Sequence, residues 1–262
     1  MRAYLSICAI YQDEAPYLRE WIEFHRLVGV ERFFLYDHNS TDNRGEVLAP
    51  YIADGTVVNH DWPVDPGQKE AYDHCLAEHG EGSRWIAFID IDEFLFSPTG
   101  VAVPEILRRF EHLPGVGVPW GVFGTSGHKT RPSGLVIESY TSRTGIPRRQ
   151  GWFKSVIDPS RTFRAFGPHA FVYKDKLAFP GLVPQFAMFD LLRINHYWTK
   201  SEAELREKFA RVRADTGGPA LVPVERALKM TSADKSARDE AILRYLPELR
   251  EALAQRATRS GP

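Results

Sequence analysis

The sequence predicts an α/β fold in which a mostly parallel central sheet is flanked by helices. Strand-like and helix-like hydrophobic segments alternate through residues 4–90, which is the pattern of a parallel sheet. The 262 residues, 43% of them hydrophobic, can bury the core of one large domain. Beyond residue 100, glycine, proline and aromatic residues become frequent, so a mixed half with long loops is expected there.

The first half should alternate strands and helices along the chain. Residues 4–11 form an apolar strand, and apolar residues then recur at helical spacing over 15–28, until Gly29 ends the helix. Further elements are expected at 32–36 (strand), 43–51 (helix), 56–60 (strand), 67–79 (helix) and 85–90 (strand). Because strands in such an order run parallel, their carboxyl ends should share one edge of the sheet, where ligands bind.

The second half should contain shorter strands and end in helices. Strands are expected at 115–120, 135–140, 152–157, 170–173 and 191–195. Ser201, with Glu204 three residues later, predicts a capped helix that runs to about Ala214. We therefore predict a domain at 1–215 and a helical appendage at 216–262.

Charge and composition exclude several classes of protein. Lys+Arg 33 and Asp+Glu 34 leave a net charge of −1, so nucleic acid is not an expected partner of the whole chain. No apolar run reaches the roughly 18 residues of a membrane span, and two cysteines are too few for a disulfide framework. We expect a cytoplasmic protein, with peripheral contact at the inner face of the membrane left open and the oligomeric state undetermined.

A local basic patch is still present in the second half. It could contact a phosphorylated or lipid-diphosphate acceptor, nucleic acid or only water. Its members are Arg143, Arg148, Arg149, Lys154, Arg161 and Arg164.

Three carboxylates, those of Asp90, Asp92 and Glu93, follow the apolar strand at 85–90. Carboxylates avoid burial unless they are paired or bind a cation, and the apolar flanks place these three inside the fold. If the strand continued, Asp90 and Asp92 would share one face and Glu93 the other. The pair could bind Mg²⁺ or Mn²⁺, which keeps positions for water and phosphate, so a diphosphate ligand is expected. The alternative is that these acids begin a surface turn.

Polar residues also follow other predicted strands. Asp13 follows the first strand, and Asp37 and Asn39 follow the second. Beside the metal strand, these side chains could hydrogen-bond a ribose or a base. Helix capping is the alternative role for the segment 37–42. His196 follows the strand at 191–195 and precedes Lys200 and a helix N-terminus, a combination that suits metal and phosphate.

The motifs form an ordered series along about residues 4–210. The series consists of Asp13-Glu14, Glu20-Trp21-Ile22 with His25, Tyr36 to Asp42, Trp85 to Phe94, Phe123 to His128, Trp152 to Val156 and Asn195 to Ser201. It resembles the nucleotide-sugar glycosyltransferases of the GT-A fold. It is similar in particular to glycosyltransferase family 92 and to the related bacterial family-2-like transferases. An Asp-x-Asp pair alone is a weak signal, whereas the ordered series is a strong one.

The resemblance implies transfer of a sugar from a nucleoside-diphosphate donor, expected to be a UDP-sugar, to a glycan or glycoconjugate acceptor in polysaccharide biosynthesis. It implies inversion at the anomeric carbon. Asp90 would contact the donor ribose or the metal, and Asp92 would bind Mn²⁺ or Mg²⁺. A histidine would complete the metal shell, with His196 the first choice and His169 the second. The cation would stabilise charge on the departing diphosphate, and Lys200 and Lys154 would add to this effect.

An inverting transferase also needs a base that deprotonates the acceptor hydroxyl. No residue unambiguously matches the usual position of this base, and the candidates are Glu138, Asp158 and His128. Two other functions stay open: a metal-dependent phosphotransferase or hydrolase, and a non-catalytic carbohydrate-binding protein on the same fold. The first usually carries a nucleophilic aspartate on its first strand, and that pattern is not found here. The intact acid pair argues against the second, because an unused cluster of charges would cost stability.

Overall fold

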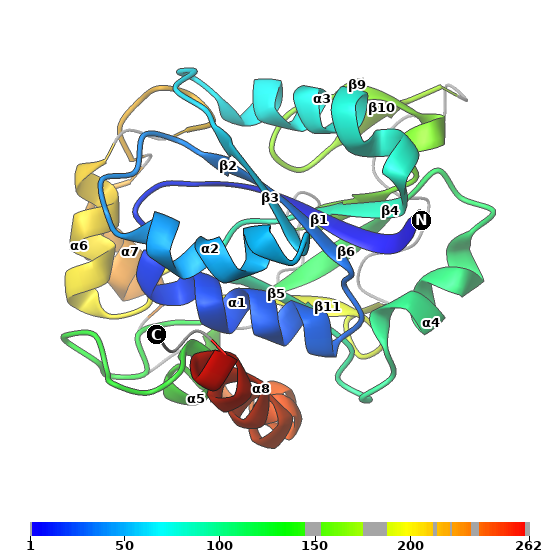
Figure 1. The fold of residues 1–262 in the computed structure, drawn as a ribbon. Helices are drawn as coiled ribbons and strands as arrows, with labels where there is room; N and C mark the ends of the chain where they lie inside the picture. Colours follow the sequence, from blue (N-terminus) through cyan, green and yellow to red (C-terminus); the bar gives the residue numbers. More distant parts are fainter. Residues whose placement is uncertain are drawn as a thin grey trace.

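The computed structural model describes residues 2–144, 153–174, 188–211, 214–220, 222–231 and 236–259. Arg148 and Arg149 of the basic patch, and Trp152 at the start of a predicted strand, lie outside the described residues. A central sheet has helices on both faces (Figure 1). The α/β prediction is therefore confirmed.

One eight-stranded sheet, in the order β3-β2-β1-β4-β8-β6-β11-β5, forms the centre of the molecule. Its strands are β1 (Ala3–Tyr11), β2 (Arg32–Asp37), β3 (Val57–Asp61), β4 (Ser83–Phe88), β5 (Glu93–Phe96), β6 (Gly115–Val122), β8 (Phe153–Ile157) and β11 (Arg193–His196). The first four sheet positions are parallel to one another, as predicted. Strand β8 is antiparallel to β4 and β6, and β5 is antiparallel to β11, which produces the expected mixed half.

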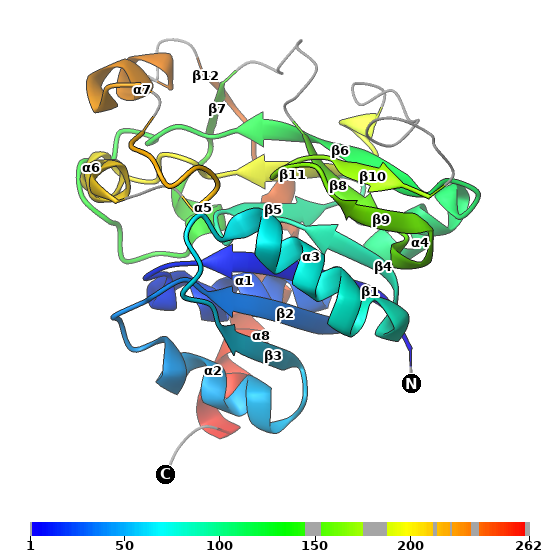
Figure 2. The same cartoon turned by 90° about the horizontal axis from the view of Figure 1, so that it is seen from above.

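Two small sheets, eight α-helices and several short 3₁₀ helices complete the described part of the chain. The small sheets pair β9 (Thr162–Ala165) with β10 (Phe171–Tyr173), and β7 (Ser142–Thr144) with β12 (Ser236–Arg238). The helices are α1 (Ala15–Leu27), α2 (Arg44–Ala53), α3 (Gln68–His79), α4 (Val103–Leu107), α5 (Val136–Ser139), α6 (Glu202–Ala210), α7 (Val224–Met230) and α8 (Leu246–Arg259). Seen from above, α1, α2 and α8 lie on one side of the sheet and α3 on the other (Figure 2).

Alternation along β1 explains how the sheet binds both helical layers. Leu5 and Ile7 are fully buried in the cluster that contains the apolar residues of α1 and α2. Cys8 and Ile10 belong to the second cluster, with residues of α3. Because successive strand residues point to opposite faces, an apolar residue at nearly every position is what a strand covered on both sides requires.

Helix α1 also fixes the chain that follows β4. The Trp21 indole nitrogen donates a hydrogen bond of 2.8 Å to the Glu93 carbonyl oxygen. His25 is fully buried; its Nδ1 donates to the Trp21 carbonyl oxygen, and its Nε2 accepts from the Leu95 backbone N–H at 3.0 Å. Two side chains of one helix therefore hold the backbone of β5.

The segment 135–140, predicted as a strand, is the short helix α5. The buried carboxylate of Glu20, on α1, accepts hydrogen bonds from the backbone N–H groups of Val136 and Ile137 at 2.8 and 3.1 Å. Those groups are the first donors of a helix, which have no partner within the helix itself, so a carboxylate there favours the helical turn.

The C-terminal helices pack against the N-terminal part of the fold. The cluster that contains Leu5 and Ile7 also contains Ile242 and Leu249, and α8 packs against α1, below it in Figure 1. Helix α6 begins at the capping box of Ser201 and Glu204 as predicted, but it ends at Ala210. In the part of the chain that the structure describes, no helix is both long and apolar enough to cross a membrane.

Candidate active site

A pocket of about 330 Å³ opens where β1 and β2 end and where the chain turns after β4. The four predicted metal ligands, Asp90, Asp92, His169 and His196, all line it, together with Lys154. These residues come from widely separated parts of the sequence. The fold therefore gathers the main chemical candidates of the sequence around one cavity.

Asp90 and Asp92 lie in a turn rather than on a continuous strand. Strand β4 ends at Phe88, and the Glu93 backbone N–H donates to the Asp90 carbonyl oxygen at 3.1 Å. The expectation of alternating faces therefore fails, because the strand ends before the acids. Glu93, fully buried at the start of β5, accepts a hydrogen bond of 2.9 Å from the Asp90 backbone N–H. Its carboxylate thus stabilises the turn.

Asp90 is paired with a buried lysine. Lys154 Nζ lies 2.9 Å from Asp90 Oδ2 and 3.7 Å from Glu93 Oε2. The other Asp90 oxygen accepts a hydrogen bond of 3.2 Å from Gln68. Burial alone would lower the pKa of Lys154, but the carboxylates of Asp90 and Glu93 outweigh burial and raise that pKa well above its usual value. Lys154 is therefore a fixed positive charge in the floor of the pocket.

Asp92 contacts a histidine and a second lysine. Its Oδ1 lies 3.4 Å from His196 Nε2, and its Oδ2 forms a short ion pair with Lys208 of α6. Burial would raise the pKa of this carboxyl, but Lys208 and His196 outweigh it and hold the pKa well below its usual value. Asp92 is therefore an ionised carboxylate beside an imidazole, even though it is buried.

The surroundings of His196 fit a metal ligand. Its Nδ1 and Glu93 Oε1 are both buried, lie 3.8 Å apart and have no hydrogen-bond partner among the residues that the structure describes. Metal-binding histidines usually orient the ring through a carboxylate at the second nitrogen, which is the place that Glu93 takes here. Burial raises the pKa of the Glu93 carboxyl well above its usual value. Among the described residues, no three His, Cys, Asp or Glu side chains cluster closely enough to hold a metal ion. A bound ion would therefore take Asp92 and His196 from the chain and its other ligands from substrate and water.

His169 also faces the pocket, as a neutral imidazole. Its Nδ1 donates a hydrogen bond of 3.0 Å to the Phe153 carbonyl oxygen, and its ring lies edge-on to Trp120. Burial, with the nearby charge of Lys154, lowers its pKa to about 4. His169 can therefore offer a lone pair or a hydrogen bond to a ligand without adding charge.

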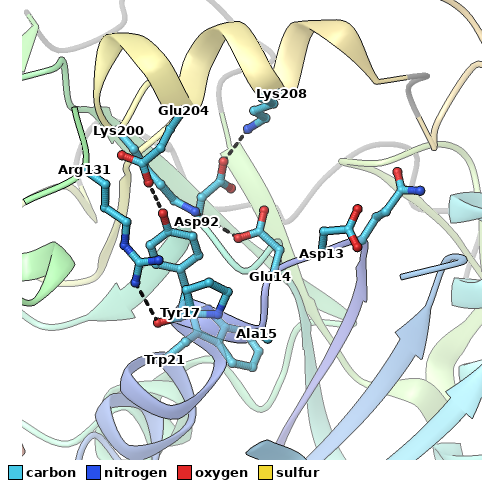
Figure 3. A network of polar contacts seen from close by, with 12 residues as sticks. Asp13, Glu14, Ala15, Tyr17, Trp21, Asp92, Arg131, Lys200, Glu204 and Lys208 are labelled. Atoms are coloured by element: carbon cyan, nitrogen blue, oxygen red, sulfur yellow. Dashed lines mark hydrogen bonds and ion pairs between the residues drawn. The ribbon is translucent and has the colours of Figure 1, made fainter. Parts of the chain in front are cut away.

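A second pocket of about 380 Å³ lies next to the first and shares Asp92, Glu14 and Lys208 with it. Lys200 Nζ lies 2.9 Å from Glu14 Oε2 and 3.2 Å from the centre of the Tyr17 ring (Figure 3). Lys200 was predicted to contact the donor diphosphate, and the structure places it in this second pocket rather than the first.

The polar residues that follow β1 and β2 mainly form hydrogen bonds and ion pairs with neighbouring loop and helix residues. Asp13 accepts a hydrogen bond of 2.7 Å from the Thr41 backbone N–H, and Asp37 accepts one of 2.9 Å from Ser40 and pairs with Arg44. Asn39 has a positive φ of 59°, typical of a turn. None of Asp13, Asp37 and Asn39 lines the first pocket, whereas their neighbour His38 does.

The three candidate bases lie outside both of these pockets. Glu138 pairs with Arg250 at 2.6 Å on the surface. Asp158 is buried, pairs with Arg84 at 2.8 Å and accepts hydrogen bonds from Ser160. His128 Nε2 lies 3.0 Å from the Ser139 carbonyl oxygen. The contacts described for these side chains are structural, and their role as the base stays a prediction.

Several pocket residues were not singled out from the sequence. His38 is buried, and neither of its ring nitrogens has a hydrogen-bond partner in the described part of the chain. Gln68 binds Asp90, Trp198 lines both pockets, and Lys208 binds Asp92. His38 lay within the predicted polar segment 37–42 and could have been chosen there. Lys208 carried no such signal, because it is one of several charges on a polar helix.

The family model for glycosyltransferase family 92 matches residues 3–178. A glycosyltransferase family 92 protein of Oryza sativa subsp. japonica is 31% identical over 216 residues, 79% of this chain and 35% of the relative. One of Arabidopsis thaliana is 31% identical over 224 residues, covering 79% of this chain and 37% of the relative. A galactan β-1,4-galactosyltransferase of Arabidopsis thaliana is 26% identical over 64% of this chain and 30% of the relative. The chain thus spans about a third of the length of these relatives.

Solved structures are more distant. TarS of S. aureus in complex with UDP has a TM-score of 0.38 and 13% identity, with 50% of this chain and 38% of that chain covered. A mycobacterial protein has a TM-score of 0.40 and 20% identity, with 78% of this chain and 70% of that chain covered. Likenesses at this level carry no argument about the site.

Proposed function

Since this chain belongs to glycosyltransferase family 92, we propose that it transfers a sugar from a nucleoside-diphosphate sugar to a hydroxyl of a glycan or glycoconjugate. We take UDP as the nucleotide and galactose as the first sugar to test, because relatives include galactan galactosyltransferases. We further propose that the anomeric carbon is inverted.

One observation carries this proposal: Asp90, Asp92, His196 and Lys154 line a single pocket at the carboxyl ends of parallel strands. Ligands of open α/β sheets bind at this edge. The pocket offers carboxylate and imidazole ligands for a cation and a buried ammonium for phosphate, and those are the groups that a nucleoside diphosphate requires.

Asp92 and His196 would hold Mn²⁺ or Mg²⁺. Their oxygen and nitrogen face each other at 3.4 Å, and Glu93 supports the far side of the imidazole ring. When bound, such an ion supplies a positive charge that stabilises the departing diphosphate. The chain's own part is to keep Asp92 ionised within the fold, which Lys208 and His196 do.

The remaining pocket residues would bind and orient the donor. Lys154, fixed by Asp90 and Glu93, supplies a second positive charge toward the phosphates without depending on a metal. His38 and Glu14 lie at the ends of β2 and β1, where their polar atoms could bind the ribose or the base. Trp198 lines both pockets, which supports a role for its indole in stacking on the donor sugar.

The donor site can be tested by isothermal titration of UDP into the protein with Mn²⁺ or with EDTA. We expect UDP to bind about tenfold or more tightly with Mn²⁺, and expect Asp92→Asn to remove that difference. Asp239→Asn is the matched control, because Asp239 is a largely buried aspartate that pairs with Arg143 and Arg193 outside the pocket. UDP binding that needs neither Mn²⁺ nor Asp92 would overturn the assignment of the metal site.

A further inference from the structure

The turn at residues 90–93, here called the acid turn, carries Asp90 and Asp92, and each of these aspartates pairs with a lysine. The two lysines differ in how far they are exposed to solvent. In the Asp90 pair, the Lys154 side chain is 1% exposed and the Asp90 side chain 33% exposed. In the Asp92 pair, the Lys208 side chain is 42% exposed and the Asp92 side chain 7% exposed. Lys154 is therefore enclosed by the fold, whereas Lys208 reaches a buried carboxylate from the solvent side.

The helix that carries Lys208 is itself well anchored. Its N-terminus has the capping box of Ser201 and Glu204, and Leu205 is fully buried. Figure 3 shows Lys208 reaching down from this helix to Asp92. Lys208 has a long, flexible stem, so its ammonium can move while the helix stays in place.

Lys208 and a divalent cation would compete for Asp92. One Asp92 oxygen faces His196 at 3.4 Å, and the other is taken by Lys208. Without a metal, the buried carboxylate needs the ammonium, because an unpaired buried charge is strongly unfavourable. With a divalent ion on Asp92 and His196, the same ammonium would face a larger charge of its own sign.

We propose that Lys208 is an exchangeable counter-ion: it neutralises Asp92 in the ligand-free protein, is displaced by the divalent cation, and then pairs with the diphosphate of the donor. This inference rests on the proposed function. In the ligand-free protein both aspartates are then paired, since Asp90 contacts Lys154 and Asp92 contacts Lys208. It predicts that the cation and the nucleotide bind cooperatively, because the cation frees the Lys208 ammonium from Asp92 and the diphosphate gives that ammonium a new partner.

The test compares Mn²⁺ binding with and without UDP in Lys208→Met. For Mn²⁺ alone, followed by electron paramagnetic resonance of free Mn²⁺, removal of the competing ammonium should tighten binding about tenfold. For UDP in saturating Mn²⁺, followed by titration calorimetry, loss of a phosphate partner should weaken binding about tenfold. The opposite signs of the two effects distinguish an exchangeable counter-ion from a lysine that only supports the fold.

Two control variants define the comparison. Lys129→Met removes the same charge from an exposed lysine outside both pockets and should change neither affinity. Lys208→Arg keeps the charge, so its affinities for Mn²⁺ and for UDP should stay close to those of the wild type. Unchanged or weaker Mn²⁺ binding in Lys208→Met would overturn the inference while leaving the donor site intact. If wild-type protein bound neither Mn²⁺ nor UDP, the proposed function itself would fail.

A measurement on the wild-type protein avoids any effect of the substitution on folding. Acetic anhydride acetylates the neutral amine form of exposed lysines and releases acetate, and an ion pair slows this reaction because it keeps the amine protonated. Mass spectrometry of peptides reports the extent of labelling at each site. Labelling of Lys208 should rise with Mn²⁺ alone and fall again when UDP is added, while labelling of Lys129 stays constant. If labelling of Lys208 did not change on addition of Mn²⁺, displacement of Lys208 from Asp92 by the cation would be contradicted.

Discussion

Acid should destabilise this protein through His25, the buried histidine of α1. Its two ring nitrogens are both used, one as donor to Trp21 and one as acceptor from Leu95. A protonated ring could not accept from Leu95, and burial lowers the His25 pKa from 6.5 to about 3. The folded state therefore resists a proton that the unfolded chain takes up below pH 6.5.

The sign and size of the effect follow from this difference. The stability is fully present above pH 6.5, the ordinary value, and is lost as the pH falls toward the folded-state pKa of about 3. At about pH 5 the loss should be about 2 kcal/mol, because each pKa unit corresponds to about 1.4 kcal/mol. Since His25 accepts a hydrogen bond from the backbone of β5, which directly follows the acid turn, the same protonation should also make the position of Asp92 less well fixed.

Urea unfolding at about pH 7.5, 6 and 5 measures this loss in the wild type and in His25→Gln. Glutamine can donate and accept as the neutral ring does, but it does not titrate. The difference in unfolding free energy between the two proteins should shrink by about 2 kcal/mol from the highest to the lowest pH. A difference that stays constant over this range would refute the reasoning, whatever the other histidines contribute to each curve.

Three further outcomes follow from the structure. Glu20→Ala should lower the free energy of unfolding by about 3 kcal/mol, because it leaves two buried N–H groups of α5 without an acceptor. The control Glu138→Ala removes only a surface ion pair and should lower that free energy by less than about 1 kcal/mol. Lys154→Met should cost about 3 kcal/mol in urea unfolding near neutral pH and less in acid, where Glu93 can take up a proton; equal losses at both pH values would contradict the pairing. In a thermal melt, UDP with Mn²⁺ at about 100 times the dissociation constant should raise the midpoint by about 5 °C or more, and EDTA should remove most of this shift.

The sheet could be predicted from the sequence because its signals are local. Apolar residues occupy nearly all of β1 and the last four positions of β4, and the strand–helix alternation predicts their parallel order. The acid turn and His196 were also visible as polar residues at strand ends, and the fold brings them to one pocket. Local pattern and global arrangement agree in this half of the molecule.

The errors arose where a distant residue decides the outcome. Segment 135–140 has a strand-like composition, but Glu20, far earlier in the chain, supplies the acceptor that favours a helix. The role of Asp158 as a base stays a prediction, but its ion pair with Arg84 on the neighbouring strand β4 likewise had no local signal in the sequence. Lys208 resembled a solvated surface lysine until the fold placed it on Asp92. Pairings of this kind depend on the tertiary arrangement and leave no local pattern.

Turnover of UDP-galactose tests most directly the claim that this pocket is the donor site of a glycosyltransferase. UDP release is measured with a β-1,4-galacto-oligosaccharide as acceptor. A panel of other UDP-sugars is tested as donors in parallel. We predict UDP release that requires Mn²⁺ or Mg²⁺ with at least one donor, that falls by about a hundredfold or more in Asp92→Asn, and that is unchanged in Lys129→Met. Release at equal rates by the wild type and Asp92→Asn, or no release from any nucleotide sugar by the folded protein, would contradict the assignment of this pocket as the donor site of a glycosyltransferase.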